Sequence, residues 1–74
     1  MSYNVAIVGA TGAVGQVLLE ILAERKFPVN TLHPLASERS AGASILFKGK
    51  PHRVKNVDQF DFSQVDFAFF SAGG

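Results

Sequence analysis

The sequence has no cysteine, little net charge and no long hydrophobic run. Without cysteine, these residues provide no disulfide scaffold, no thiolate metal site and no thiol nucleophile, which suits a reducing compartment. A net charge of +1 creates no field that favours nucleic acid or a membrane surface as a partner. The apolar runs are far shorter than the roughly 20 residues that span a bilayer. We therefore expect a cytoplasmic protein.

The composition is that of a small folded domain. Hydrophobic residues make up 47% of the sequence and charged residues 18%, values that predict a packed core instead of disorder. A length of 74 residues fits one small domain and excludes a large two-domain enzyme within this chain.

The apolar pattern of the first third predicts a strand followed by a helix. Residues 3–9 form a nearly continuous β-branched run, typical of a strand buried on both faces of a parallel sheet. Apolar residues then recur at helical spacing, which predicts a helix lying on the sheet. These positions are Val14, Val17, Leu18, Ile21 and Leu22. The helix should end near Lys26 or Phe27, because Pro28 cannot continue it without losing a backbone donor.

The remaining residues predict two strands and a hairpin. Residues 31–36 form an extended run in which Pro34 removes one ladder donor, indicating an edge-like or irregular strand. Residues 44–54 have the pattern of a hairpin with a Lys-Gly-Lys turn. Residues 56–64 contain polar turn formers around two phenylalanines that should cover the sheet from a loop. Residues 65–70 are apolar enough for a second buried strand.

A glycine-rich turn stands between the first strand and the helix. Residues 9–15 read Gly-Ala-Thr-Gly-Ala-Val-Gly. A dinucleotide-binding turn needs a tight bend, a residue without Cβ where backbone approaches a pyrophosphate, and a small residue where helix meets sheet. Gly9, Gly12 and Gly15 fit these roles in that order, and Thr11 adds a hydroxyl near the free amides of the helix. The alternative is a turn whose glycines serve packing alone.

These elements together predict an α/β protein with a mostly parallel sheet. The order of strand, helix, strand, hairpin and strand is typical of a Rossmann-type dinucleotide-binding fold. Such a domain has two similar halves, so residues 1–74 correspond to the N-terminal half only, a partial NAD(P)-binding Rossmann domain.

The residues after the second predicted strand favour NADP over NAD. NAD-binding domains place an acidic residue there, about 20 positions after the glycines, to bind the ribose 2′-hydroxyl. Here Ser37, Arg39 and Ser40 follow the strand and offer hydroxyl and guanidinium donors suited to a 2′-phosphate. Glu38 is the complication, because its carboxylate would bind the 2′-hydroxyl of NAD if it turned inward.

Three segments resemble the N-terminal part of the aspartate-β-semialdehyde dehydrogenase family: residues 9–15, 35–42 and 70–74. The second reads Leu-Ala-Ser-Glu-Arg-Ser-Ala-Gly and the third Phe-Ser-Ala-Gly-Gly. The resemblance implies an NADP-dependent oxidoreductase that reductively dephosphorylates β-aspartyl phosphate to aspartate semialdehyde, for lysine, threonine and methionine biosynthesis. It also implies a homo-oligomeric parent whose catalytic and dimerisation domain is absent from this chain.

The resemblance also implies roles for individual residues. In that family the first segment holds the pyrophosphate, the second meets the 2′-phosphate and the third borders the cofactor. The implied cofactor-binding residues are Gly9, Thr11, Gly12, Ala13, Val14, Ser37, Arg39, Ser40, Ser71, Ala72 and Gly73. The family's catalytic cysteine, histidine and arginine lie beyond residue 74. We therefore assign no catalytic or metal-binding residue and expect the chain alone to be inactive.

Several alternatives remain open at this point. The N-acetyl-γ-glutamyl-phosphate reductases usually carry an aromatic residue where this chain has Ala13 and Val14. A non-catalytic branch close to the family, or a nucleotide-binding module, would share this region. Extended short-chain dehydrogenases and epimerases also begin with Gly-Ala-Thr-Gly, but their next loop is unlike residues 37–42. The basic residues of the hairpin region fit a solvated edge better than an RNA contact.

Overall fold

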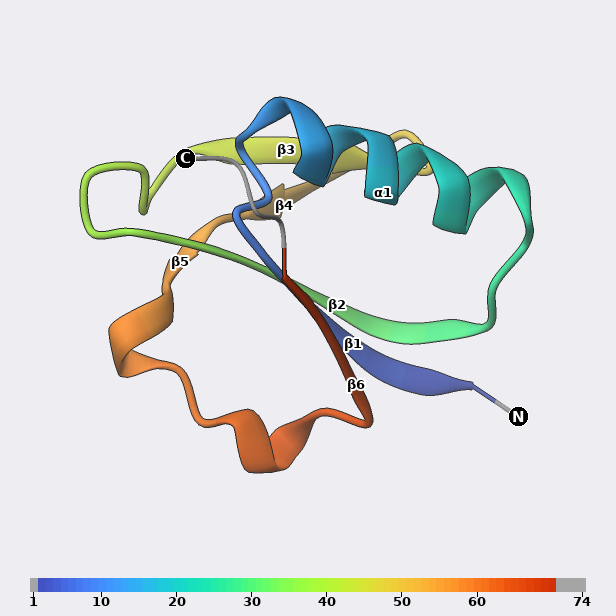
Figure 1. The fold of residues 1–74 in the computed structure, drawn as a ribbon. Helices are drawn as coiled ribbons and strands as arrows, with labels where there is room; N and C mark the ends of the chain where they lie inside the picture. The colour runs from blue at the N-terminus through green and yellow to red at the C-terminus, as the bar shows by residue number, and fades with distance from the viewer. Residues whose placement is uncertain (1, 71–74) are drawn as a thin grey trace.

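The chain folds as a parallel sheet that carries a helix and a hairpin on one face, in a computed structural model that describes residues 2–70 (Figure 1). The elements are β1 (Tyr3–Val8), α1 (Ala13–Glu24), β2 (Val29–Ala36), β3 (Ser44–Phe47), β4 (Lys50–Arg53), β5 (Lys55–Asn56), the 3₁₀ turns η1 (Val57–Gln59) and η2 (Phe62–Gln64), and β6 (Phe67–Phe70). Within the described residues, no helix has the length and apolar character needed to cross a membrane.

The sheet has the strand order β5-β2-β1-β6, and every pair in it is parallel. Strands β3 and β4 form a separate antiparallel hairpin. Because the chain builds outward from β1 through β2 to β5 and then returns to β6 on the other side of β1, the strand order reverses between β1 and β6. Ligands of open α/β sheets bind at the carboxyl ends of the strands beside such a reversal. The predicted α/β class with a mostly parallel sheet is confirmed.

One face of α1 packs on the sheet, and it differs from the predicted face. Gly15, Leu19 and Leu22 are buried, whereas Val14, Val17 and Ile21 are 49%, 51% and 41% exposed. The prediction that these last three lie on the sheet is therefore wrong. The rotation of α1 is set by the close approach of Gly15 to the turn before it, which turns residues 15, 19 and 22 toward the core.

The core lies between the sheet, α1 and the hairpin. It consists of Val5, Ile7, Ala10, Leu19, Leu22, Leu32, Ala36, Ile45, Phe47 and Val54. Strand β2 pairs with β1 along its length but with β5 only at its last two residues. The carbonyl of Leu35 points toward β1 and accepts hydrogen bonds from the turn after that strand. Because neighbouring residues of a strand direct their backbone groups to opposite sides, the backbone of Pro34 points toward the β5 side, where most of β2 is unpaired. The sheet order places β2 between β5 and β1, so the prediction of an edge-like position is wrong, although β5 pairs with only the last two residues of β2.

The turns predicted around the helix and the hairpin are confirmed. Past α1, Lys26 adopts a left-handed φ of 55°, and the amide of Phe27 donates to the carbonyl of Leu22 at 3.0 Å, which closes the helix before Pro28. The hairpin turns at Lys48 and Gly49, whose φ values of 53° and 79° are those of a two-residue turn.

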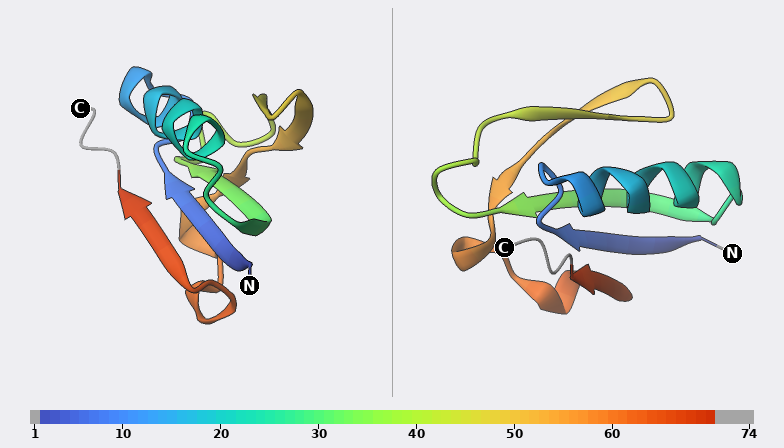
Figure 2. Two further views of the ribbon diagram at one scale, coloured as in Figure 1. Left: turned by 90° about the vertical axis from the view of Figure 1, so that its right-hand side faces the viewer. Right: turned by 45° about the horizontal axis from the view of Figure 1, so that its top comes forward.

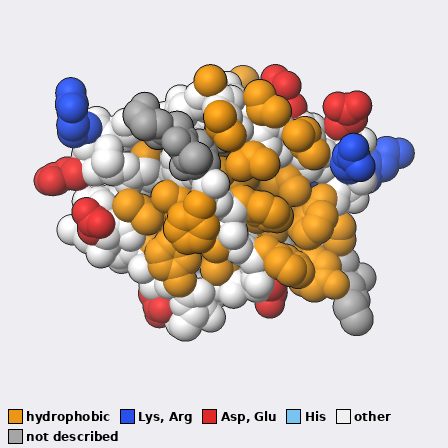
Figure 3. Space-filling view, viewed as in Figure 1, with side chains coloured by type: hydrophobic (Ala, Val, Ile, Leu, Met, Phe, Trp, Pro, Cys, Tyr) orange, Lys and Arg blue, Asp and Glu red, His pale blue; other side chains and the backbone are white. Residues whose placement is uncertain are grey.

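Strand β6 lies at the edge of the sheet, which contradicts the prediction of a second buried strand. Phe67 is 43% and Phe70 68% exposed, because β6 pairs only with β1 within the described residues. Figure 3, drawn from the same side as Figure 1, shows hydrophobic side chains gathered on the face toward the viewer.

Two phenylalanines of the loop between β5 and β6 lie on the face of the sheet away from α1. Phe60 contacts His33 and Phe62, and Phe62 stacks on Phe70 with ring centroids 6.3 Å apart. The predicted covering of the sheet by Phe60 and Phe62 is confirmed, and Figure 2 shows their loop on that side.

Polar groups close the sheet at the amino ends of its strands. The amide of Asn4 donates to Oδ2 of Asp66 at 2.8 Å, and the amide of Asp66 donates to the carbonyl of Asn4 at 2.8 Å. The side chain of Asn4 also donates to the carbonyl of Gln64 and accepts from Nδ2 of Asn30. These bonds fix where β6 begins relative to β1.

Candidate functional site

A cavity of about 670 Å³ lies at the carboxyl ends of β1 and β2. Its volume falls within the range of small-molecule sites. Residues of three segments line it: the glycine turn with the start of α1, the loop after β2, and η1. They are Val8, Gly9, Thr11, Gly12, Ala13, Val14, Ala36, Ser37, Ser40 and Val57. Seven of the predicted site residues therefore meet in one cavity.

Gly9 and Gly15 are glycines because the backbone requires it. Gly9 has a left-handed φ of 84°, and its amide and that of Ala10 both donate to the carbonyl of Leu35, at 2.8 and 3.1 Å. A Cβ at residue 15 would overlap the carbonyl oxygen of Gly9 and lie 2.8 Å from Cα of Ala10. The tight bend at Gly9 is as predicted, and Gly15 is the predicted small residue at a close contact, although that contact is with the turn after β1 and not with the sheet itself.

Gly12 differs from these two, because nothing in the described chain requires a glycine there. Its φ of −81° and ψ of 169° suit any residue, and a Cβ would lie an ordinary 3.5 Å from its nearest neighbour, the carbonyl oxygen of Gly9. A side chain at residue 12 would instead stand at the wall of the cavity. The missing Cβ thus leaves room for a ligand to approach the backbone.

The start of α1 presents free hydrogen-bond donors. Among the described residues, the amides of Ala13, Val14 and Gly15 have no acceptor, and the N-cap Gly12 offers no side-chain cap. The first turn also carries no acidic residue. Free amides at the positive end of a 12-residue helix bind anions, phosphate groups in particular.

The loop after β2 brings two of its three predicted residues into the cavity. Ser37 and Ser40 line it, and the amide of Ser40 donates to the carbonyl of Ser37 at 2.9 Å, which holds the two hydroxyl-bearing residues in one turn. Arg39 and Glu38 are exposed and are not among the lining residues. The structure therefore does not bring the guanidinium to the cavity wall. Ser71, Ala72 and Gly73 lie outside the described residues.

Val57 is a lining residue that the sequence pattern did not indicate. It follows β5, a strand of only two residues that pairs Asn56 with Ala36 of β2. A two-residue strand has no readable periodicity, so the pattern gave no signal for this position. Val8 and Ala36 were missed as lining residues too, although both lie at predicted strand ends.

The residues that line the cavity carry no group for proton transfer. Its lining residues carry no titratable side chain. The two groups with shifted pKa values lie elsewhere: burial, and secondly the charge of Lys55, lowers the pKa of His33, and hydrogen bonds from Ser63 lower the pKa of Asp61. Within residues 2–70, no cluster of side chains suits a metal ion.

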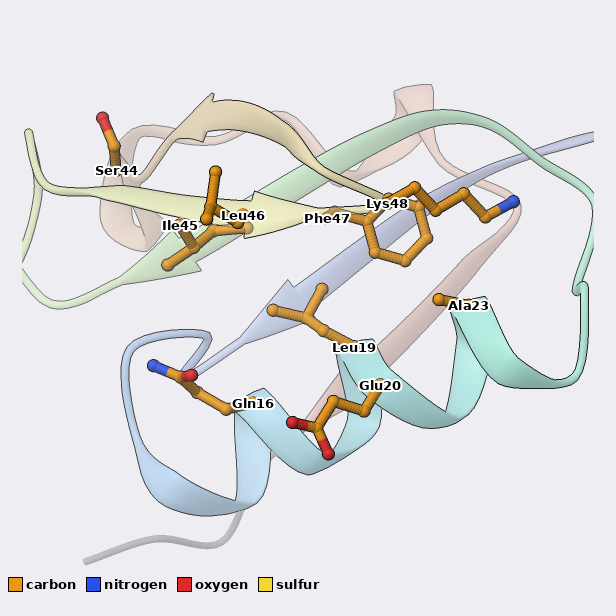
Figure 4. A pocket seen from close by; sticks show the side chains of 9 residues that line it. All are labelled: Gln16, Leu19, Glu20, Ala23, Ser44, Ile45, Leu46, Phe47 and Lys48. Atoms are coloured by element: carbon orange, nitrogen blue, oxygen red, sulfur yellow. The ribbon is translucent and has the colours of Figure 1, made fainter.

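A second cavity, of about 400 Å³, lies between α1 and β3 and shares no residue with the first. Figure 4 shows Leu19 of α1 and Phe47 of β3 facing each other across it, with Gln16 and Glu20 along the helix. It has no free helix terminus and no glycine turn, so the cavity at the carboxyl ends is the stronger candidate for a nucleotide.

Comparison with known proteins identifies relatives over nearly the whole chain. The family described as "Semialdehyde dehydrogenase, NAD binding domain" matches residues 4–74. Aspartate-semialdehyde dehydrogenase of Vibrio mimicus is 62% identical over 72 residues, covering 97% of this chain and 23% of the relative. A USG-1 protein homolog of Azotobacter vinelandii is 59% identical over 70 residues, covering 95% of this chain and 21% of the relative.

A solved structure shows the same fold. The crystal structure of aspartate semialdehyde dehydrogenase II from Vibrio cholerae, complexed with ASA, matches with a TM-score of 0.94 and 61% identity. The match covers 100% of this chain and 24% of that one. The chain thus spans about a quarter or less of the length of the proteins it matches.

Proposed function

Because this chain belongs to the semialdehyde dehydrogenase NAD-binding domain family, we propose that it is the NADP-binding part of an aspartate-semialdehyde dehydrogenase. The family supports a nicotinamide dinucleotide as the cofactor. The observation that carries the proposal is the meeting of the glycine turn, the free amides of α1, Ser37 and Ser40 in one cavity.

The residues of the cavity fit the two phosphate-bearing parts of NADP. The free amides of Ala13 and Val14 face a pyrophosphate, which can approach the backbone because Gly12 has no Cβ, and the hydroxyl of Thr11 lies beside it. The hydroxyls of Ser37 and Ser40 donate to the 2′-phosphate. Arg39 is exposed on the same turn, and we propose that its flexible side chain reaches the 2′-phosphate from the solvent side. Ser71, Ala72 and Gly73 are proposed to border the cofactor after β6.

The nicotinamide ring supplies hydride transfer when the cofactor is bound. The contribution of this chain is to bind and orient the dinucleotide. The sequence contains no cysteine, and the cavity contains no acid or base, so we expect the chain alone to be inactive. We propose that residues 1–74 are a partial domain, and that the catalytic and dimerisation domain lies in another part of the protein.

For the whole enzyme we propose the reductive dephosphorylation of β-aspartyl phosphate to aspartate semialdehyde, in lysine, threonine and methionine biosynthesis. Relatives named aspartate-semialdehyde dehydrogenase support this reaction. We further propose a cytoplasmic homo-oligomer with no nucleic-acid or membrane partner. The small net charge of this chain supports the absence of a nucleic-acid partner, and its lack of cysteine suits the cytoplasm.

A second candidate is a nucleotide-binding protein without this reaction. The relative named USG-1 protein homolog is 59% identical, nearly as similar as the dehydrogenases, and its name records no activity. Dehydrogenase activity of the purified full-length protein, with NADP, phosphate and aspartate semialdehyde as substrates, separates the two candidates. Activity excludes the second, and cofactor binding without activity excludes the first.

Calorimetric titration of the chain with NADP and with NAD tests the cofactor. We expect NADP to bind at least about tenfold tighter, a difference of 1.4 kcal/mol, and Arg39→Ala to remove most of that preference. Arg53→Ala is the matched control, because Arg53 is also exposed but lies on the hairpin, outside the cavity. Equal affinities for the two dinucleotides would contradict NADP as the cofactor.

A further inference from the structure

The second cavity lies beside a strand edge that has no partner within the described residues. Strand β3 pairs only with β4, and Figure 4 shows β3 between α1 and β4. The cavity of about 400 Å³ is lined by residues of α1, of β3 and of the hairpin turn, and by none of β4. It therefore lies at the open edge of β3, and it shares no residue with the proposed dinucleotide site.

Leu46 presents free backbone groups at this edge. Its partner across the hairpin is Pro51, which has no N–H to donate. Residue pairs of an antiparallel ladder alternate between hydrogen-bonded and non-hydrogen-bonded positions, and Leu46 with Pro51 is a non-hydrogen-bonded pair. The N–H and C=O of Leu46 therefore point away from β4, and its side chain is 70% exposed. An unpaired strand edge of this kind is a template for pairing with another chain.

The floor of the cavity is apolar, and its rim carries one carboxylate. Leu19, Ile45 and Phe47 form the floor and are 4%, 7% and 6% exposed. Glu20 is exposed at the rim, and among the described residues no cation forms an ion pair with it. Figure 4 shows Lys48 extending away from Glu20, and its ammonium lies 5.5 Å from the centroid of the Phe47 ring. A ligand that fits this cavity has an apolar group for the floor and a cation for Glu20.

We propose that an extended peptide segment of a partner protein binds in this cavity as an additional strand, antiparallel to β3. One peptide residue exchanges backbone hydrogen bonds with Leu46. The residues on either side of it both face α1, because side chains two residues apart lie on the same face of a strand. One of them is apolar and enters the cavity, and the other is basic and faces Glu20.

The buried face of β3 argues against a second copy of this chain as the occupant. A second copy that paired through its own β3 would have to fill the cavity with Ile45 or Phe47, and both are buried in its core. A flexible segment has both faces free, so its apolar side chain is available. The proposal goes beyond the proposed function and does not depend on a nucleotide.

The test of the strand pairing is a nuclear magnetic resonance titration of the chain with the blocked peptide acetyl-Thr-Leu-Thr-Lys-Thr-amide. The amide signal of Leu46 should move downfield and its hydrogen exchange should slow, because the N–H gains an acceptor. The peptide acetyl-Thr-Leu-Pro-Lys-Thr-amide keeps the leucine and the lysine but lacks the central donor. It should bind about fivefold more weakly, the effect of one lost hydrogen bond.

Glu20→Gln tests the charge at the rim. In the unsubstituted chain, a peptide with glutamate in place of lysine should bind about threefold more weakly, which is the size of an exposed ion pair. In Glu20→Gln the two peptides should bind equally. Glu24→Gln is the matched control, because Glu24 is an exposed carboxylate on the same helix that does not line the cavity, and it should keep the threefold difference.

Each contrary outcome overturns the proposal. These outcomes are an unmoved Leu46 signal at millimolar peptide, equal binding of the proline peptide, and a preference for lysine that survives in Glu20→Gln. If the same signals move when the chain alone is concentrated, a second copy is the occupant and the partner peptide is excluded. None of these results changes the expected NADP titration, so the peptide site and the nucleotide site fail separately.

Discussion

The two ends of the parallel sheet use their polar groups in opposite ways. At the amino ends, Asn4 is hydrogen-bonded to both Asn30 and Asp66, so this is the closed end of the sheet, where polar groups are paired with one another. At the carboxyl ends, the amides of Ala13 and Val14 have no acceptor within the described residues, and both residues line a cavity. The paired polar groups and the free donors thus lie at opposite ends of the sheet, and a substitution that removes one should leave the other in place.

The largest expected effect comes from filling the helix-to-turn contact that shapes the open end. Gly15→Ala places a Cβ against the carbonyl oxygen of Gly9 and Cα of Ala10, which are backbone atoms and cannot move without displacing the turn. We expect a loss of about 3 kcal/mol, which leaves a chain of this size mostly unfolded. Urea unfolding followed by circular dichroism measures it. An unchanged midpoint would show that α1 does not approach the turn this closely.

Gly12→Ala makes the same chemical change as Gly15→Ala, three residues earlier in the chain and at the cavity wall. The backbone at Gly12 suits alanine, so unfolding should change by less than about 1 kcal/mol. The new methyl group stands at the cavity wall, and NADP affinity should fall at least about tenfold, or 1.4 kcal/mol. Calorimetry measures the affinity and urea unfolding the stability. Retained affinity would mean that no phosphate approaches the backbone here.

Asp66→Ala removes a side-chain hydrogen bond at the closed end of the sheet. The amide of Asn4 loses its acceptor, which should cost about 1 kcal/mol of folding free energy. NADP affinity should stay the same, because the residue lies at the other end of the sheet. Asp58→Ala is the control, since that carboxylate is exposed on η1, away from the closed end. If Asp66→Ala weakens NADP binding as much as it weakens folding, the two ends are not independent.

The smallest effect concerns His33, which belongs to neither end. Burial and the charge of Lys55 lower its pKa below the usual 6.5, so the unfolded chain binds a proton more readily than the folded chain. Its contribution to stability is therefore full above pH 6.5 and declines as the pH falls through the window below that value. Urea midpoints between pH 7.5 and 5.5 should fall less in His33→Gln than in His52→Gln. Equal slopes would rule out this contribution.

Local backbone requirements made part of the structure predictable from the sequence. The glycine turn is recognisable because Gly9 needs a left-handed φ and Gly15 a contact that excludes a Cβ, and both needs are met within seven residues. The hairpin is recognisable for the same reason, since Lys48 and Gly49 carry the whole turn. The fold class follows from the order of these local elements.

Features that depend on distant contacts were not predictable. The apolar residues of α1 lie on more than one face of the helix. The close contact between Gly15 and the preceding turn decides that Leu19 is buried and Val17 is not. Val57 reaches the cavity through a two-residue strand that has no pattern of its own. Arg39 was assigned from residue type, which cannot tell whether an exposed side chain lines a cavity.

The most direct test of the open end is an amide nuclear magnetic resonance spectrum of the chain recorded while NADP is added. We expect the signals of Ala13 and Val14 to move most, because their free amides meet the phosphates, whereas the signals of Asn4, Asn30 and Asp66 should stay in place. Shifts concentrated at the amino ends of the strands, or no shift at the start of α1 in a folded chain, would contradict this expectation.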